Sequence, residues 1–227
     1  RAVSSSSGSA DVLEAMGYPL EENPQLITAR LKRTNFAFFF APLYHPAMKH
    51  AAPVRREIGV RTVFNVLGPL ANPAAAPVQL MGVYSRELLV PMAETLRLLG
   101  LKAALVVHSD EGLDEISPLA RTEYALLYGG KVETGEFRPP HQTQVHTLDE
   151  LRADNKEKSL AMFRDVIAGK NTAGAYMTAL NAAFAKKLFA AVKAGAPSFD
   201  PLPTGDEIVE LYDLIMSGAL SDVARFP

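Results

Sequence analysis

The chain has 227 residues, of which 48% are hydrophobic and 21% charged, as is typical of a globular protein with a sizeable core. Its net charge of −2 gives no general attraction for nucleic acid or anionic lipid, so neither kind of partner is expected. Because cysteine is absent, disulfide scaffolds, cysteine-based zinc sites and thiol nucleophiles are excluded.

The localisation expected from the sequence is cytoplasmic. No uninterrupted apolar run approaches the roughly 20 residues that a membrane span requires, and the start at Arg1 shows no charged-then-apolar signal segment. A chain that begins with Arg rather than Met is also expected to be a fragment of a longer protein. The histidines show no HExxH or similar spacing, so a histidine-bound catalytic metal is not expected.

The N-terminal stretch RAVSSSSGSADVLEAMG, 1–17, is predicted to be a Ser/Gly loop that opens a helix ending near Gly17. Such a loop presents free backbone N–H groups, hydroxyl donors and the positive end of the helix dipole, which together suit a phosphate. Arg1 adds a positive charge beside them. The alternative is a flexible linker in which Ser9 is an ordinary N-cap.

The next segment is predicted to contain short elements and the most basic region of the chain. AFFFAP, 37–42, is expected to form a short strand, and TVFNVLG, 62–68, a strand or a loop. Between them, PAMKHA and PVRREIG are two expected helical turns, each opened by a proline. The turn NVLGPLANP, 65–73, is expected to brace the neighbouring site.

Arginine in this basic region is suited to holding a carboxylate through two parallel hydrogen bonds. The spacing alone does not choose between Arg55 and Arg56, and the alternative is a solvated helical face. The basic and histidine side chains here are His45, Lys49, His50, Arg55, Arg56 and Arg61.

Residues 78–109 form the clearest structural unit. VQLMGVY, 78–84, and LKAALVVHS, 101–109, are predicted strands, and the intervening residues 85–100 are a predicted helix. This order implies a parallel pair with a right-handed connection, and α/β proteins bind ligands at the carboxyl ends of such strands. The helix is expected to end at Gly100 and to bury Leu89, Met92, Leu96 and Leu99.

The second half of the chain is predicted to be mainly helical. Residues 128–160 are expected to form short strands and turns, and residues 172–195 a long Ala-rich helix. A further helix over 204–218 begins with a capping box, in which Glu207 follows three residues after Thr204. The predicted fold class is α/β, with a largely parallel central sheet flanked by helices.

The loop HSDEGLDEISP, 108–118, gathers the carboxylates Asp110, Glu111, Asp114 and Glu115 within six positions. Like charges so close repel one another, so the cluster is unfavourable unless water or a cation sits against it. Asp114 and Glu115 suit Mg²⁺, which prefers one or two carboxylates together with water and phosphate oxygens. The alternative is a solvated loop in which Asp114 caps a following turn.

Four stretches together resemble the anthranilate phosphoribosyltransferase family, which has the nucleoside phosphorylase/phosphoribosyltransferase class of fold. They are RAVSSSSGSADVLEAMG at 1–17, FAPLYHPAMKHAAPVRREIGVRTVFNVLGPLANPA at 40–74, QLMGVY at 79–84, and VVHSDEGLDEIS at 106–117. The resemblance implies Mg²⁺-dependent transfer of the phosphoribosyl group from 5-phosphoribosyl 1-diphosphate to the amino group of anthranilate. It also implies a homodimer when the upstream domain is present.

The resemblance also implies roles for single residues. Positions matching Asp114 and Glu115 serve the metal, the position of Arg55 holds the anthranilate carboxylate, and His45 borders the anthranilate channel. Ser6 stands where many members have Lys. No general base is named, because the anthranilate amine is already neutral at pH 7. The residues expected to line the phosphoribosyl diphosphate site are Arg1, Ala2, Val3, Ser4, Ser5 and Ser9.

The chain also departs from the family. Members carry upstream a helical domain, a GTGGD-type loop and a Lys-His-Gly-Asn run, none of which occurs here, so 1–227 is expected to be a phosphoribosyl-transfer α/β domain without its N-terminal helical domain and first strands. Asn181 is expected to hold a helix contact rather than a ligand. Two alternatives stay open: an enzyme like pyrimidine nucleoside phosphorylase, and a non-catalytic ligand-binding fragment.

Overall fold

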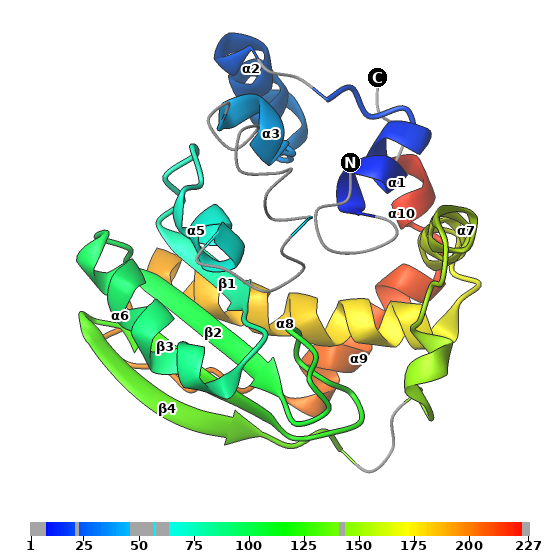
Figure 1. Cartoon of the computed structure of the whole chain (residues 1–227). Helices are drawn as coiled ribbons and strands as arrows, with labels where there is room; N and C mark the ends of the chain where they lie inside the picture. The colour runs from blue at the N-terminus through cyan, green and yellow to red at the C-terminus, as the bar shows by residue number, and fades with distance from the viewer. Residues whose placement is uncertain (1–7, 21–22, 46–56, 58–63, 141–143, 224–227) are drawn as a thin grey trace. The chain divides into compact units, whose positions relative to one another are not determined.

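The computed structural model describes residues 8–20, 23–45, 57, 64–140 and 144–223. These divide into two compact units (Figure 1), the first within Arg1–Ala75 and Asp154–Leu160, the second within Ala76–Ala153 and Ala161–Val223. The expected single phosphoribosyl-transfer domain over 1–227 stays a prediction. In the described ranges, no helix combines the length and the apolar character that crossing a membrane requires.

The first unit contains the helices α1 (Ser9–Ala15), α2 (Pro24–Thr34), α3 (Ala41–Tyr44) and α5 (Phe64–Leu70). Local signals explain the bounds of α2. The Asn23 side chain accepts the Gln25 N–H at 2.9 Å, Pro24 occupies the first turn, and Asn35 ends the helix in the left-handed region at φ 56°. Helix α1 confirms the predicted N-terminal helix, which Gly17 follows at φ 87°.

The second unit is built on a four-stranded sheet with the order β1-β2-β3-β4. Its strands are β1 (Val78–Gly82), β2 (Ala103–Ser109), β3 (Thr122–Tyr128) and β4 (Lys131–Phe137). Val78 pairs with Ala103 in the parallel β1–β2 ladder, as predicted.

The α/β class is confirmed, but the sheet of the described residues is mixed rather than largely parallel. β2 pairs antiparallel with β3, and β3 pairs antiparallel with β4. No helix crosses over between β2 and β3, so the chain returns in the opposite direction. Gly129 and Gly130, at φ 57° and 78°, supply the two positive φ angles that a tight β3–β4 hairpin requires.

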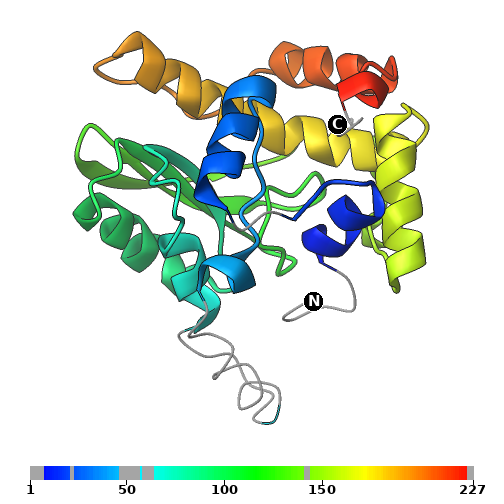
Figure 2. The same ribbon diagram turned by 90° about the horizontal axis from the view of Figure 1, so that it is seen from above.

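Helices cover both faces of this sheet (Figures 1 and 2). Helix α6 (Leu89–Leu98), preceded by the 3-10 helix η1 (Arg86–Leu88), packs on β2, β3 and β4. Helix α8 (Thr172–Ala194) packs on the other face, against β1 and β2, and α9 (Gly205–Met216) packs on α8. The remaining elements are η2 (Leu148–Glu150), α7 (Lys156–Ile167) and α10 (Leu220–Val223).

The core lies between the sheet and α8. Alternate residues of β2, among them Leu105 and Val107, join Leu180 and Phe184 of α8 in one buried cluster. This cluster holds the Ala-rich helix against the strands. Both C-terminal helices match their predictions: Gly195 ends α8 at φ 64°, and Thr204 caps α9 through the Glu207 N–H.

Several predicted elements are wrong. Residues 37–40 form no strand, and α3 begins at Ala41. The predicted strand or loop at 62–68 is helical from Phe64 as α5. An apolar run of this length is compatible with either a helix or a strand, which explains the wrong prediction. The prediction of short strands and turns over 128–160 is confirmed by β4 and is wrong from Lys156, where α7 begins. The two expected turns at 46–51 and 53–59 lie outside the described residues, apart from residue 57.

The predicted buried face of α6 is correct for Leu89, Met92 and Leu96, all of which are less than 9% exposed. It is wrong for Leu99, which is 56% exposed. Leu99 is the C-cap residue, and Gly100 turns the chain away at φ 85°, so Leu99 does not continue the helical face.

Candidate functional site

The structure describes four of the residues predicted to bind substrate or metal. Ser9 and His45 belong to the first unit, and Asp114 and Glu115 lie side by side in the second. The predicted ligand residues Arg1, Ala2, Val3, Ser4, Ser5 and Arg55 lie outside the described residues.

The start of α1 differs from the expected arrangement of free donors. Gly8, rather than Ser9, is the N-cap, with extended angles of φ −118° and ψ 163°. The Gly8 N–H donates to Asp11 Oδ2 at 3.2 Å, and Lys156 Nζ lies 3.4 Å from Asp11 Oδ1. The hydrogen bond from Gly8, with Lys156 as a further cause, lowers the pKa of Asp11. One donor expected to face a phosphate is therefore bound to a carboxylate.

His45 ends α3 and joins it to the turn that follows α5. Its Nε2 lies 3.1 Å from the carbonyl oxygen of Ala71, so Nε2 carries the hydrogen and donates it. Asn72 shapes the same turn, because its Oδ1 accepts the Ala74 N–H at 2.9 Å. The predicted rigid turn over 65–73 is wrong up to Leu70, where α5 ends, and a turn follows only after it. Its role as a brace for the neighbouring site stays a prediction.

The acidic loop joins β2 to β3 and begins with a closed turn around Ser109. Ser109 is fully buried; its N–H donates to the Leu113 carbonyl at 3.0 Å, and its hydroxyl accepts the Leu113 N–H at 3.1 Å. Gly112 completes the turn at φ 86°, with its N–H donating to the Ser109 carbonyl at 2.9 Å. The backbone that carries the carboxylates is thus ordered by its own hydrogen bonds.

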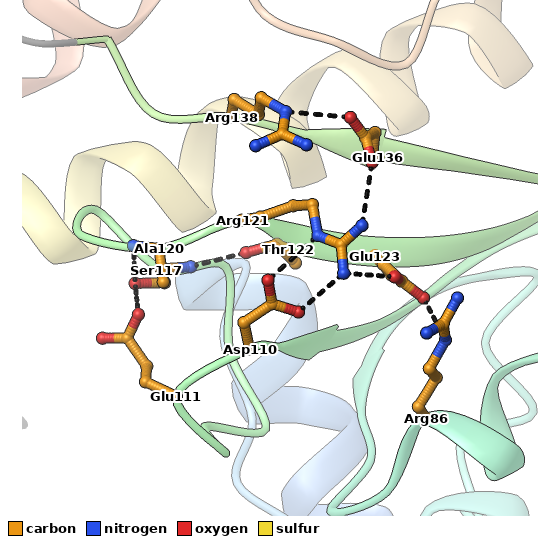
Figure 3. A network of polar contacts seen from close by, with 10 residues as sticks. All are labelled: Arg86, Asp110, Glu111, Ser117, Ala120, Arg121, Thr122, Glu123, Glu136 and Arg138. Carbon is orange, nitrogen blue, oxygen red and sulfur yellow. Dashed lines mark hydrogen bonds and ion pairs between the residues drawn. The ribbon is translucent and has the colours of Figure 1, made fainter.

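Asp110 is neutralised by an arginine from the far end of the loop (Figure 3). Arg121 binds it with two parallel hydrogen bonds, of 2.9 Å from Nε and 3.1 Å from a terminal nitrogen. The same guanidinium lies 2.8 Å from Glu123 and 3.2 Å from Glu136. The hydrogen bond between Asp110 and Arg121 lowers the pKa of Asp110 and raises the pKa of Arg121.

Glu111 is held inside the loop. Its Oε2 accepts the Ser117 hydroxyl hydrogen at 2.7 Å (Figure 3). The Ser117 oxygen itself accepts the N–H groups of Leu119 and Ala120, each at 3.0 Å. The other oxygen, Oε1, is buried and has no hydrogen-bond partner among the described residues. Glu111 therefore serves the shape of the loop.

Asp114 and Glu115 differ from the other two carboxylates. Both are exposed, and neither makes a hydrogen bond or ion pair with another described residue. Glu115 is exposed, but protein atoms surround its carboxyl group closely enough to desolvate it. This desolvation is the larger cause, and the negative charge of Asp114 the smaller, of a raised pKa of Glu115. Among the described residues no cation pairs with these two adjacent carboxylates, which leaves them available to an external one.

The donor set suits magnesium better than zinc. Within the described residues there is no group of three or more His, Cys, Asp or Glu side chains that could hold a metal ion. A structural or catalytic zinc site needs at least three such protein ligands, whereas Mg²⁺ uses one or two carboxylates and completes its shell with water and substrate phosphates. The pair Asp114 and Glu115 fits the second pattern.

The sequence reasoning missed Gly82, the last residue of β1. A Cβ atom at this position would lie 1.7 Å from the carbonyl oxygen of Asp114, so β1 and the acidic loop meet here backbone to backbone. A glycine within an apolar strand often marks such an approach, and this signal could have identified it. Arg121 was missed as well, because its partners are set by the antiparallel return of β3.

Replacing Arg121 with Gln is expected to lower the midpoint of thermal unfolding at neutral pH, because three carboxylates then lose their shared cation. The pKa values of Asp110 and Glu136 are lowered in the folded state from ordinary values near 4, that of Asp110 chiefly by Arg121 and that of Glu136 first by Arg138 and then by Arg121. Their contribution is present above about pH 4 and is lost as the pH falls through the lowered values, so the difference from the parent should shrink in acid.

Unfolding scans of both proteins between about pH 7 and about pH 3 check this dependence. Arg97→Gln is the matched control, because its ion pair with Glu94, at 2.6 Å, lies within one helix and is open to solvent. An Arg121→Gln variant that differs from the parent no more than this control at neutral pH would show that the network is unimportant.

Comparisons with known proteins show the family of the chain. Residues 1–200 match the family described as "Glycosyl transferase family, a/b domain". The chain is 47% identical over 201 residues to "Anthranilate phosphoribosyltransferase" of Alkalilimnicola ehrlichii, covering 88% of this chain and 58% of that protein. It is 42% identical over 220 residues to the protein of the same name from Dechloromonas aromatica, covering 96% and 62%.

Solved structures match over nearly the whole chain. The anthranilate phosphoribosyltransferase from Saccharomyces cerevisiae in complex with 4-fluoroanthranilate superposes with a TM-score of 0.76 at 25% identity, covering 96% of this chain and 61% of that one. The same enzyme in complex with PRPP and Mg superposes with a TM-score of 0.77 at 23% identity, which speaks for the fold alone. The chain spans roughly three fifths of the length of these relatives.

Proposed function

The chain belongs to the glycosyl transferase family through its a/b domain, and from this premise we propose that the full-length protein is an anthranilate phosphoribosyltransferase. It transfers the 5-phosphoribosyl group from 5-phosphoribosyl 1-diphosphate to the amino group of anthranilate, and diphosphate leaves. The observation that carries the proposal is that the four carboxylates of the acidic loop have different partners. Protein groups bind Asp110 and Glu111, while Asp114 and Glu115 stay available to a cation.

Asp114 and Glu115 would hold Mg²⁺ against the diphosphate. Carboxylates cannot face a polyphosphate directly, because both are negative, and a cation between them removes the repulsion. When bound, Mg²⁺ neutralises charge on the departing diphosphate and so lowers the barrier to its departure. The yeast relative with the same fold is described in complex with PRPP and Mg, which supports this assignment.

The remaining site residues act by binding and orientation. The segment Arg1–Ser5, with Ser9, would line the phosphoribosyl diphosphate site, and His45 would border the anthranilate channel. Because the anthranilate amine is neutral at pH 7, it needs little base catalysis, so positioning and electrostatics should carry most of the rate. We name no catalytic acid or base.

Arg55→Lys is expected to raise the KM for anthranilate by about 10- to 100-fold, with a smaller change in kcat. A lysine cannot replace the two parallel hydrogen bonds from a guanidinium to the anthranilate carboxylate. Steady-state kinetics with varied anthranilate measure the effect. Arg56→Lys is the matched control and should leave this KM within about twofold; the assignment of Arg55 is wrong if the two variants exchange behaviours.

The direct test of the activity uses the full-length protein. It is mixed with anthranilate, 5-phosphoribosyl 1-diphosphate and Mg²⁺, and the loss of anthranilate fluorescence is followed. Turnover that requires all three components is expected. Absence of turnover refutes the proposal, and phosphorolysis of thymidine or uridine by the same preparation would favour a pyrimidine nucleoside phosphorylase instead.

We further propose that the full-length protein is a homodimer that works in the cytoplasm. Support for the dimer comes from the family resemblance alone, and light scattering on the full-length protein tests it.

A further inference from the structure

We propose that Asn181 is a positioning residue for the Asp114–Glu115 pair. Asn181 lies on α8, while the pair lies in the loop between β2 and β3. The inference rests on the proposed Mg²⁺ site and names the group that fixes where the two carboxylates stand.

The side-chain amide of Asn181 binds both backbone groups of Ile116, the residue directly after Glu115. Its Oδ1 accepts the Ile116 N–H at 3.0 Å, and its Nδ2 donates to the Ile116 carbonyl at 3.0 Å. The second Nδ2 hydrogen is donated to the carbonyl of Met177, one turn earlier in α8, also at 3.0 Å. The amide is therefore anchored to its own helix while it holds the loop.

This double contact requires an amide at position 181. Asp supplies acceptors without a donor, and a hydrocarbon side chain supplies neither. Turning the amide over would set its nitrogen against the Ile116 N–H and its oxygen against two carbonyls, so the hydrogen-bond pattern fixes its orientation. Ile116 itself is 1% exposed and belongs to the main core cluster, so the anchor point is rigid.

The backbone on both sides of the acidic pair is fixed by similar means. The carbonyl of Asp114 lies against Gly82 of β1, and the Ser117 N–H donates to the Thr122 hydroxyl at 2.9 Å. The carboxylates between these anchors make no hydrogen bond or ion pair with another described residue. A backbone held at three points, with side chains left free, is the arrangement that a preorganised metal site needs.

Without the Asn181 contacts, the loop should still close through the Ser109 turn, but Glu115 would lose the anchor beside it. The loop and its two carboxylates must then be ordered when the cation binds, and the free-energy cost of this ordering weakens the metal affinity. Changes to groups that orient metal ligands typically weaken affinity by about 10- to 100-fold. We expect a loss in this range for Asn181→Leu.

The test measures metal binding in the full-length protein rather than turnover. Mn²⁺ replaces Mg²⁺ as a paramagnetic probe, and its binding is titrated by electron paramagnetic resonance in the presence of 5-phosphoribosyl 1-diphosphate. Asn181→Leu, and Asn181→Ala as a second variant in which water can reach Ile116, should both weaken Mn²⁺ binding by about 10- to 100-fold. Circular dichroism confirms that each variant is folded.

Asn171→Ala is the matched control. Asn171 begins the same helix, and its Oδ1 accepts the Gly174 N–H at 2.8 Å, so its loss weakens α8 without touching the acidic loop. It should lower thermal stability and leave Mn²⁺ affinity within about twofold of the parent.

The possible outcomes separate the two claims. If the parent binds no Mn²⁺ together with the sugar diphosphate, the proposed function fails. If the parent binds it and the folded Asn181 variants bind it equally well, the positioning role of Asn181 is overturned while the proposed function stands. If the Asn171 control loses as much affinity as the Asn181 variants, the effect belongs to α8 in general and the inference is likewise overturned.

Discussion

The double substitution Asp114→Asn/Glu115→Gln in the full-length protein is expected to lower kcat/KM for 5-phosphoribosyl 1-diphosphate by about 1,000-fold. Neither carboxylate makes a hydrogen bond or ion pair with another residue that the structure describes, and both become neutral amides, so the site loses its attraction for Mg²⁺ and nothing offsets the charge of the leaving diphosphate. Backbone contacts of the loop are unaffected, so the variant should fold. Anthranilate fluorescence, followed over a range of Mg²⁺ concentrations, measures the loss.

The matched control is Asp110→Asn/Glu111→Gln, which removes two charges from the same loop. These carboxylates are bound to Arg121 and Ser117, so their loss should reduce thermal stability and leave the Mg²⁺ dependence within about threefold of the parent. Equal loss of activity in both double variants would mean that overall loop charge, not a specific pair, governs the reaction.

The second large effect is expected at Gly82. In Gly82→Ala the new methyl group would lie 1.7 Å from the Asp114 carbonyl oxygen, a contact that no side-chain rotation can relieve. Either β1 or the acidic loop must move, and we expect a loss of about 3 kcal/mol in the free energy of unfolding. Urea denaturation measures this loss, and any folded fraction should need a higher Mg²⁺ concentration for activity.

Gly205→Ala provides the control for a glycine in open space. Gly205 is the first residue of α9, and a Cβ there meets no atom within 4 Å. Its free energy of unfolding should change by about 0.5 kcal/mol or less. A Gly82→Ala variant as stable and as dependent on Mg²⁺ as the Gly205→Ala variant would contradict the close approach of β1 to the loop.

Elements with a long periodic pattern and marked ends could be predicted from the sequence. Helix α9 carries a complete capping box at Thr204, α8 ends at Gly195, and the β1–α6–β2 unit follows from its alternating apolar runs. Short elements without such marked ends could not be predicted. The run at 62–68 is too brief for its periodicity to separate helix from strand. The direction of β3 depends on the path of the loop between β2 and β3, which the local sequence does not reveal.

The sequence could propose residues for the candidate site but not the contacts around them. The resemblance selected Asp114 and Glu115 from the four carboxylates, whereas the physical reason for the selection lies in Arg121 and Ser117, which engage the other two. The prediction that Asn181 is structural agrees with the structure, yet its partner lies 65 residues away in sequence. Tertiary contacts of this kind leave no local pattern in a single sequence.

The most direct test of the proposed metal site is a crystal structure of the full-length protein with 5-phosphoribosyl 1-diphosphate and Mn²⁺, with the ion located by its anomalous scattering. The predicted result is an anomalous peak that contacts the carboxylates of Asp114 and Glu115 on one side and the diphosphate on the other. A sugar diphosphate bound away from this loop, with no ion at the two carboxylates, would contradict it.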